Sequence, residues 1–558
     1  MKMIDLLKNK ELTDLHIPAM CLLAGCMEEP EVVREMDESD GLETLLYHIN
    51  SVKAELQTLV LRAIAYATRD VNICQKFHKW NIEMTLMTLL RSKKSDEVKT
   101  EACHVVTALS SLRASQDTFG NSGLLTVLIS LLTCSSDPLR LSSCQALASL
   151  TKGHRENCSL AVNGTTSLLE LLKSLACLVV PATTVLCNMC MNEGPRTCLQ
   201  EKGAISALLA CLVSTDPEIQ TSVLQALAAL VCDSKSRAEL RAADRLPLII
   251  NLLNSEYKEV YFAACWTVSS CAADESTVQE FCKLGVLQIL HKLNLSKSRC
   301  SHFNETVYTK LLAKNLPAKY SFTGHLSSCD FVLDGFYDVG KLRPDTQLPS
   351  LEELIRMPLN VHRPTLLINA APCADDSLSK SKEEENVQQW PKLGVSQTNS
   401  YQWLPPTDPI LQGYINETHT MVQPSMSMQE QIVILARFVS NKMGGAVTRL
   451  NEFSWELHCS KLKEELNSNV IPIGKIQKGI YYHRALLFKV LADKLAICST
   501  LVRGSYGRAW NEVLLRQDST TCCQSLPETS SKFIVDLMYN PGDLLVANGR
   551  NSYSYCRF

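Results

Sequence analysis

Cysteine is the residue type in this sequence most able to do chemistry, with 24 copies beside 12 histidines. Cys187 and Cys190 have the spacing of a redox or metal-binding pair, but no second pair and no histidine lies near them in the sequence. Many other cysteines recur among alanines and leucines, for example Cys103, Cys144 and Cys265. A thiol in such surroundings behaves as a small apolar residue. We therefore predict cysteines packed in the core of a protein from a reducing compartment, with no metal and no cofactor.

A catalytic thiol also needs an imidazole within hydrogen-bond reach. Cys498 follows a predicted helix and is expected to face the core, and Cys522 and Cys523 lie in a stretch rich in serine and threonine without an adjacent histidine. His483 has no partner of this kind in the sequence, so we expect it to be a capping or surface residue. The sequence therefore offers no convincing Cys–His pair.

Composition and charge narrow the function further. The chain has 558 residues, a net charge of −3, 46% hydrophobic and 20% charged residues. These values give no general attraction to nucleic acid or to an anionic membrane. The first residues contain no secretory hydrophobic stretch, and the apolar segment 168–191 is interrupted by Glu170, Lys173 and Pro181. We therefore predict no membrane insertion and no signal peptide.

One unit repeats about every 41 residues through the first half of the chain. Each copy has a glycine or small polar residue, an apolar helix, a turn and a longer helix rich in alanine, as in residues 123–150 and 203–230. The glycine suits a tight bend between helices. The anchor residues are Gly41, Asn81, Gly123, Gly164, Gly203, Asp244 and Gly285.

These copies resemble the armadillo family. Seven copies cover roughly residues 30–295, and a divergent helix pair before Gly41 is expected to cap the stack. The resemblance implies a right-handed superhelix that binds other proteins along its concave groove. In family members that bind extended peptides, asparagines of the inner helix form a ladder; here Asn188 alone keeps the amide, which argues against nuclear transport. The matching positions elsewhere hold Tyr66, Ala108, Ser149, Ala229 and Ser270.

The candidate binding residues of the groove are therefore Asn188, Ser149 and Ser270, together with Trp266 of the same predicted helix as Ser270. For Asn188 the more economical interpretation is a polar side chain satisfied inside the protein, because buried amides usually find local partners.

The repeat pattern stops near residue 295. We predict a solenoid over residues 1–300, a capping helix and linker over 301–328, and a second domain over 329–558. Residues 372–400 are polar and dense in charge, which predicts a disordered loop. The Asp334-Gly335-Phe336 sequence is not a kinase motif, because no phosphate-binding glycine loop or catalytic loop accompanies it.

The second half combines helices and strands. Apolar spacing predicts helices over 428–445 and from Ala485 to Leu495, with extended segments at 470–474, 501–504, 508–513 and 532–537. This order, and most of all residues 479–504, resembles the domain that precedes the kinase in plant CTR-type and EDR-type protein kinases. That domain is in turn similar to the transglutaminase-like branch of the papain-like fold. The predicted architecture is thus mainly α: an armadillo α-solenoid followed by an α+β domain.

The resemblance also implies where a catalytic triad would stand. Members of that fold place a cysteine at the start of the helix, a histidine on the next strand and then an aspartate. The matching positions here hold Tyr481, Arg508 and Asp536. A phenol is a poor nucleophile without a base, and a guanidinium cannot accept a proton. We therefore expect no catalytic residues, and we expect Arg508 and Asp536 to form a structural ion pair.

The sequence thus favours a non-enzymatic scaffold or adaptor that binds proteins and has no small-molecule substrate. The alternative is a papain-like hydrolase or acyltransferase with a relocated cysteine, which would require a Cys Sγ within about 4 Å of a His nitrogen in a cleft. The expected location is the cytoplasm, and the resemblance adds an association with cilia or flagella.

Overall fold

The computed structural model describes residues 2–9, 11–296, 301–370, 405–516 and 530–557. The disordered loop predicted for residues 372–400 lies outside the described residues. The chain divides into two compact units, Met1–Thr277 and Val278–Phe558. Each unit is described by itself below.

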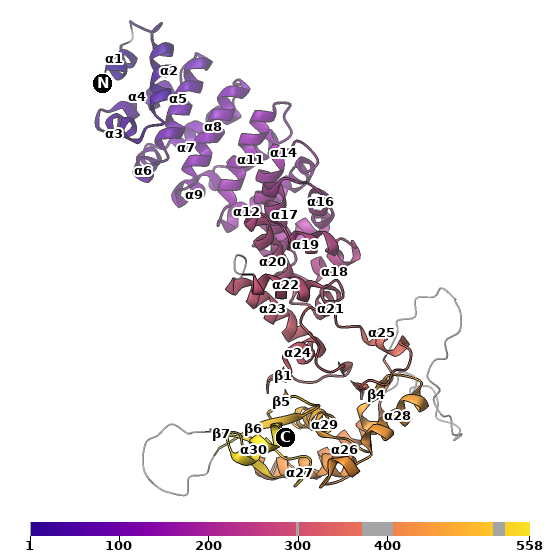
Figure 1. The fold of residues 1–558 in the computed structure, drawn as a ribbon. Coiled ribbons are helices and arrows are strands. Elements are labelled where there is room, and N and C mark those ends of the chain that lie inside the picture. The colour runs from indigo at the N-terminus through magenta and orange to yellow at the C-terminus, as the bar shows by residue number, and fades with distance from the viewer. Residues whose placement is uncertain (1, 10, 297–300, 371–404, 517–529, 558) are drawn as a thin grey trace, which may run out of the picture. The chain divides into compact units, whose positions relative to one another are not determined.

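Unit 1 is a stack of helices in triplets (Figure 1). Each triplet has two shorter helices followed by a longer third helix. The third helices pack against one another in succession along the unit. They are α5 (Ala54–Ala67), α8 (Asp96–Leu109), α11 (Asp137–Thr151), α14 (Ala176–Cys190), α17 (Pro217–Leu230) and α20 (Lys258–Cys271). The predicted solenoid of repeated helices is confirmed.

The first helix of each triplet was not part of the predicted repeat. Five of the six in unit 1 have nine residues: α3 (Pro30–Glu38), α6 (Val71–Lys79), α9 (Arg113–Asn121), α15 (Glu193–Glu201) and α18 (Ser234–Ala242); α12 (Arg155–Ala161) has seven. Such helices are short and mostly polar, so they give little apolar periodicity. In α9 the one large apolar side chain that is buried belongs to Phe119.

The anchor residues begin the second helices, α4 (Gly41–His48), α7 (Ile82–Arg91), α10 (Leu124–Leu131), α13 (Thr165–Leu171), α16 (Ala204–Cys211) and α19 (Leu246–Leu252). Gly123 has a φ of +79°, which lets the chain turn sharply from α9 into α10. Asn81, Gly203, Asp244 and Gly285 also have positive φ. In the first repeat this conformation belongs to Asp40, one residue before the predicted anchor Gly41.

Gly164 is the second exception, because its backbone is right-handed and it ends a short 3₁₀ turn, Val162–Gly164. A Cβ atom there would lie 2.9 Å from Cγ1 of Ile129. The absence of a side chain at Gly164 therefore allows close packing against α10, and it is not needed for a bend.

Unit 2 begins within α21 (Glu275–Lys283), which continues the triplet pattern into α22 (Val286–Leu295) and α23 (His302–Lys314), and α24 (Leu316–Thr323) follows. Its larger sheet has five strands in the order β1-β5-β6-β7-β8, all antiparallel. They are β1 (His325–Leu326), β5 (Ser499–Arg503), β6 (Ala509–Arg516), β7 (Ser530–Val535) and β8 (Leu544–Val546). Strand β1 lies in the segment predicted as a linker, because two residues are too short to give a strand pattern.

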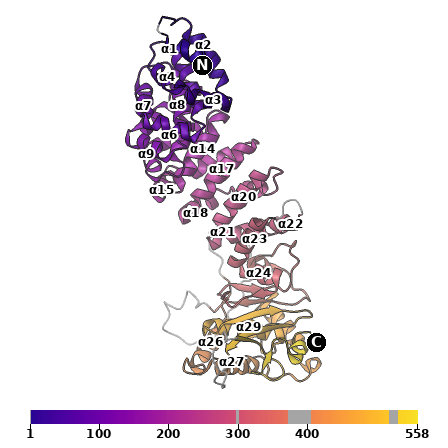
Figure 2. The same cartoon turned by 90° about the vertical axis from the view of Figure 1, so that its left-hand side faces the viewer.

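A smaller sheet joins β2 (Phe336–Asp338), β3 (Thr365–Ile368) and β4 (Val470–Pro472). The remaining helices are α25 (Leu351–Arg356), α26 (Pro409–Met421), α27 (Met428–Lys442), α28 (Trp455–Leu466), α29 (Tyr481–Lys494) and α30 (Arg550–Arg557). Helix α29 is the centre of this domain (Figure 2): it contacts β5, β6, α26 and α27, and every side chain from Tyr481 to Ala492 is buried. The predicted α+β domain after the solenoid is confirmed.

Candidate functional site

The positions compared with an asparagine ladder lie near the end of each third helix. Tyr66, Ala108, Ser149, Asn188 and Ser270 are half-buried there, and Ala229 is buried. Such residues offer little surface to a partner.

The amide of Asn188 is used inside the solenoid. Its Nδ2 donates to the carbonyl oxygen of Ala148 and to Oγ1 of Thr151, both at 3.0 Å. These two bonds join α14 to α11, so the side chain acts as a link between neighbouring repeats.

A more exposed row lies one turn earlier on the same helices. Residues four positions before the ladder share its helix face, because a helix repeats every 3.6 residues. All six side chains are exposed: Arg62, His104, Gln145, Thr184, Gln225 and Trp266. We call these six residues the third-helix row. Of this row, the sequence analysis selected Trp266 alone, which is 38% exposed; the i−4 spacing from each ladder position could have found the others.

One end of the row carries paired charges. Nη2 of Arg62 lies 2.6 Å from Oε1 of Glu101, and Nδ1 of His104 lies 3.1 Å from Oε2 of the same carboxylate. Burial alone would raise the pKa of Glu101, but His104 and Arg62 together hold it below its usual value. The row therefore begins with an ion-paired patch and ends with an exposed indole.

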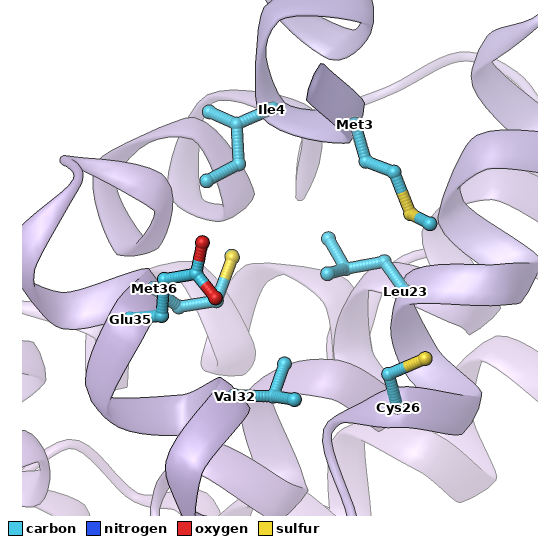
Figure 3. A pocket seen from close by; sticks show the side chains of 7 residues that line it. All are labelled: Met3, Ile4, Leu23, Cys26, Val32, Glu35 and Met36. Carbon is cyan, nitrogen blue, oxygen red and sulfur yellow. The ribbon is translucent and has the colours of Figure 1, made fainter. Parts of the chain in front are cut away.

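Unit 1 also contains a pocket near its N-terminal end that the sequence analysis did not identify. It has a volume of about 260 Å³ and lies among α1 (Lys2–Lys8), α2 (His16–Cys26) and α3 (Figure 3). Its lining is apolar except for Glu35, and consists of Met3, Ile4, Leu23, Cys26, Val32, Glu35 and Met36.

In unit 2, Tyr481 is the first residue of α29 and is buried to 2% exposure. Its hydroxyl hydrogen-bonds to the hydroxyl of Tyr539 at 2.6 Å. Its ring meets the ring of Tyr555 edge to face, with centroids 5.4 Å apart. Burial, and then the hydrogen bond with Tyr539, raise the pKa of Tyr481 well above its usual value. The phenol is therefore neutral and surrounded by other aromatic rings.

Arg508 lies directly beside this tyrosine. Its guanidinium carbon is 4.0 Å from the centre of the Tyr481 ring, a cation–π contact. Its Nη1 donates to the carbonyl oxygen of Tyr555 at 2.7 Å. Tyr555 belongs to α30, so this arginine fastens α30 over the start of α29. The structure thus brings together the two residues that the resemblance paired.

Asp536 does not form the expected ion pair with Arg508. Its carboxylate instead accepts backbone N–H groups from Met538, Tyr539 and Asn540, at 2.7, 2.9 and 3.0 Å. Three backbone donors satisfy a carboxylate in a tight turn without a cation. Asp536 therefore holds the turn that places Tyr539 against Tyr481.

A different cysteine and histidine approach one another in this domain. Sγ of Cys459, on α28, lies 3.9 Å from Nε2 of His483, on α29. Both are buried, at 3% and 0% exposure. Burial raises the pKa of the thiol to about 11 and lowers the pKa of the imidazole well below its usual value. The pair therefore holds a neutral thiol and a neutral imidazole inside the core.

The other nitrogen of His483 explains its position. Nδ1 accepts the N–H of Ile480 at 3.1 Å, so the ring caps the start of α29. Of the two roles expected for His483, capping or surface, the structure shows the capping role, with the ring fully buried. The sequence analysis missed Cys459, which has no motif around it and lies 24 residues from His483.

The remaining sulfur candidates are placed as follows. Cys498 is exposed, contrary to the prediction that it faces the core, because it alternates with the buried Ile497 and Ser499 at the start of β5. Cys522 and Cys523 lie outside the described residues. Cys187 and Cys190 pack within α14, and burial raises the pKa of Cys187 to about 11.

In the parts of the chain that the structure describes, no group of three or more His, Cys, Asp or Glu side chains is arranged to hold a metal ion. Likewise, no described helix combines the length and the apolar character needed to cross a membrane.

Comparison with known proteins gives three kinds of match. A family model described as EDR1/CTR1/ARMC3, peptidase-like, matches residues 405–545. The serine/threonine-protein kinase CTR1 of Arabidopsis thaliana is 27% identical over 43% of this chain and 27% of its own length. An engineered protein of known crystal structure is 22% identical with a TM-score of 0.52, over 56% of this chain and 77% of that one, which supports the fold alone.

The human armadillo repeat-containing protein 3 matches far more of the chain. It is 35% identical over 635 aligned residues, which cover 99% of this chain and 73% of the human protein. The match includes both the repeats and the domain built around α29. By this extent and identity, the chain belongs to the family of armadillo repeat-containing protein 3.

Proposed function

We propose that the protein is a non-enzymatic scaffold that binds a partner protein along the third-helix row, and that its C-terminal domain has lost catalysis. The observation that carries this proposal is the row itself: six exposed side chains at equivalent positions of six successive helices. A surface that repeats once per helix triplet suits an elongated protein segment, since equivalent groups recur at regular intervals.

The composition of the row supports a polypeptide partner. It combines Arg62, which is ion-paired with Glu101, and His104, which contacts the same carboxylate, with amide groups at Gln145 and Gln225 and the indole of Trp266. Amides can hydrogen-bond to a peptide backbone, and an exposed tryptophan is enriched among residues that dominate binding energy.

Charge insertion in the middle of the row tests this function. The double variant Thr184→Arg, Gln225→Arg is expected to lose at least tenfold in affinity for partners identified by proximity labelling in native cells. The matched control is Ser159→Arg, Thr197→Arg, which adds the same charge at exposed positions of the short first helices α12 and α15. Equal binding by the two double variants would exclude the row as the binding surface.

The proposed loss of catalysis rests on the surroundings of Tyr481. The hydroxyl contacts another phenol, and the adjacent side chain is a guanidinium, which stays protonated and donates only. A general base that could activate a nucleophile is therefore missing from the contacts described for this tyrosine.

The alternative function, a hydrolase or acyltransferase with a relocated cysteine, has one observation in its favour: the 3.9 Å approach of Cys459 to His483. It can be tested with a peptide-based electrophile of the kind that labels cysteine proteases. We expect no labelling at Cys459, because the thiol is buried and protonated, and only slow labelling at the exposed Cys498. Rapid labelling that Cys459→Ala abolishes and Cys498→Ala does not would establish the enzyme.

We further propose that this scaffold acts in the cytoplasm, in association with cilia or flagella. Buried cysteines on the helices of the solenoid support a reducing compartment. Imaging of a tagged full chain in ciliated cells tests the location, and exclusion from the cilium and its base would contradict it.

A further inference from the structure

Three charged side chains from distant segments of unit 2 meet beside α24. Asp338 ends β2, Arg363 precedes β3 and Arg503 ends β5. Nη2 of Arg363 lies 2.5 Å from Oδ2 of Asp338, and Nη2 of Arg503 is ion-paired with Oδ1 of the same carboxylate. The N–H of Gly340 also donates to Oδ1, at 2.8 Å. We call Asp338, Arg363 and Arg503 the two-arginine cluster.

The two-arginine cluster carries excess positive charge. Burial would raise the pKa of Asp338, but Arg363 and Arg503 hold it below its usual value, so the carboxylate is ionised. Two guanidinium groups face this single negative charge. Tyr320 packs under Arg503, with the guanidinium carbon 4.1 Å from its ring centre, and burial raises the pKa of that phenol to about 12. The tyrosine therefore adds no negative charge.

The cluster also holds unused hydrogen-bond donors. Nε and Nη1 of Arg503, Nε of Arg363 and the hydroxyl of Tyr482 are buried without a well-formed hydrogen bond among the described residues, and the hydroxyl of Tyr320 interacts with Arg503. The Arg503 side chain is 4% exposed and the Arg363 side chain 25%. A buried charged donor without an acceptor destabilises a protein, so several in one place require an explanation.

The backbone of Gly340 comes close to both guanidinium groups. A Cβ atom added to Gly340 would lie 3.7 Å from Nη1 of Arg363 and 3.8 Å from Nη1 of Arg503. These are ordinary van der Waals distances, so a group at this point would contact both guanidinium groups. The sequence neighbours Lys341, Arg343 and His362 are exposed, so further basic groups lie at the surface close by in the chain.

We propose that the two-arginine cluster binds a small tetrahedral oxyanion, a phosphate group, between Arg363, Arg503 and Gly340. Water could satisfy the donors but would leave the excess charge uncompensated. A phosphate supplies both the negative charge and enough acceptors for two forked guanidinium groups, which a carboxylate with its two oxygens does less completely. This site is separate from the protein-binding row of the solenoid.

Isothermal titration of the full chain with inorganic phosphate, at constant ionic strength, tests the site. We expect saturable binding, weakened at least tenfold by Arg363→Met, which keeps an aliphatic side chain but removes the guanidinium and with it the cation–π contact to the Tyr482 ring. Arg449→Met is the matched control, because Arg449 is 76% exposed in the same unit and pairs only with Glu452. No heat with phosphate, or equal affinity in both variants, would overturn the proposal.

Two further arms separate this site from a purely structural cluster. Acetate at the same ionic strength should bind at least tenfold more weakly than phosphate, and equal binding would refute a tetrahedral dianion. Asp338→Asn frees both arginines, so the rise in melting temperature caused by phosphate should be larger than in the unmodified chain. A smaller rise would contradict the proposal.

If Arg363→Met does not fold, Arg363→Lys, which keeps the charge but loses the forked guanidinium, should still weaken phosphate binding severalfold.

Discussion

The solenoid of unit 1 and the domain around α29 in unit 2 bury polar groups in different ways. In the solenoid, single polar side chains link neighbouring repeats by one or two hydrogen bonds, as the half-buried Asn188 does to α11 and as the buried Thr267 does to the carbonyl of Leu224 at 3.0 Å. In unit 2 a single side chain, Arg484, holds several segments together. Stability is therefore distributed along the repeats and concentrated at one helix in the second domain.

The contacts of Arg484 show this concentration. The residue is fully buried, and it donates to carbonyl oxygens of Gly479, Leu537 and Met443 at 2.7, 2.7 and 2.9 Å, and to Oγ of Ser440 at 3.0 Å. These acceptors belong to the segment before α29, the segment after β7, and α27 with its following loop. Burial lowers the pKa of Arg484 to about 10, so it remains charged at neutral pH.

Arg484→Met is therefore expected to have the largest effect. Four acceptors lose their donor inside the core, which should lower the free energy of unfolding of unit 2 by about 4 kcal/mol. Hydrogen exchange read by mass spectrometry should show lost protection across α27, α29 and β7 together. The matched control is Arg437→Met on α27, where the side chain is exposed; equal loss of protection in both variants would contradict the assigned role.

Leu147→Ala should have a somewhat smaller and more local effect. Leu147 is fully buried in α11, and its truncation should lower stability by about 3 kcal/mol through lost burial and a cavity. Because each repeat contacts only its neighbours, the loss of protection in hydrogen exchange should centre on α8, α11 and α14. Uniform loss over all of unit 1 would show that the solenoid is more cooperative than this comparison implies.

Asn188→Ala tests a single link between two neighbouring repeats, α14 and α11. The substitution removes the two bonds from α14 to α11 and should lower stability by about 1 kcal/mol. Partner binding should stay within twofold of the unmodified chain, since the amide is used inside the protein. A tenfold loss of binding with unchanged stability would instead make Asn188 a contact residue.

Asp274→Asn should have the smallest effect on stability, and this effect should depend on pH. Hydrogen bonds from Thr277 and Ser276, with the charge of Arg241, lower the pKa of Asp274 to about 2, against the opposing effect of burial. A carboxyl group with a lowered pKa stabilises the fold above its ordinary pKa near 4, and this contribution disappears as the pH falls toward 2. Asp274→Asn should thus unfold at lower urea than the unmodified chain at pH 7, and the two midpoints should converge between pH 4 and 2. Asp137→Asn, at a surface ion pair with Arg140, serves as the control. If the urea midpoints of Asp274→Asn and of the unmodified chain still differ below pH 2, the titration of Asp274 is not the cause of the difference.

The repeats were largely predictable from the sequence because their signal recurs. Each anchor residue is weak alone, but the same interval predicts the same pair of helices through the first half of the chain. What the pattern could not contain is the short first helix of each triplet. In α9, for instance, three buried residues include the polar Ser115 and Gln116, so apolar spacing gives no warning of a helix.

The candidate site in unit 2 was only half predictable. The contact between Tyr481 and Arg508 follows from a motif, whereas the turn made by Asp536 depends on three backbone groups that no side-chain pattern reveals. The approach of Cys459 to His483, and of Arg363 to Arg503, joins segments far apart in the chain. Such contacts depend on how helices and strands pack, and packing is not encoded in local spacing.

The position of α30 has a consequence for access to the start of α29. Tyr555 of α30 covers the Tyr481 ring, its carbonyl holds Arg508, and its hydroxyl accepts the N–H of Leu537 at 3.1 Å. Replacing Tyr481 by cysteine alone would create a small void beneath a helix that still blocks access. A reactive thiol at this position would therefore require displacement of α30 as well as the substitution itself.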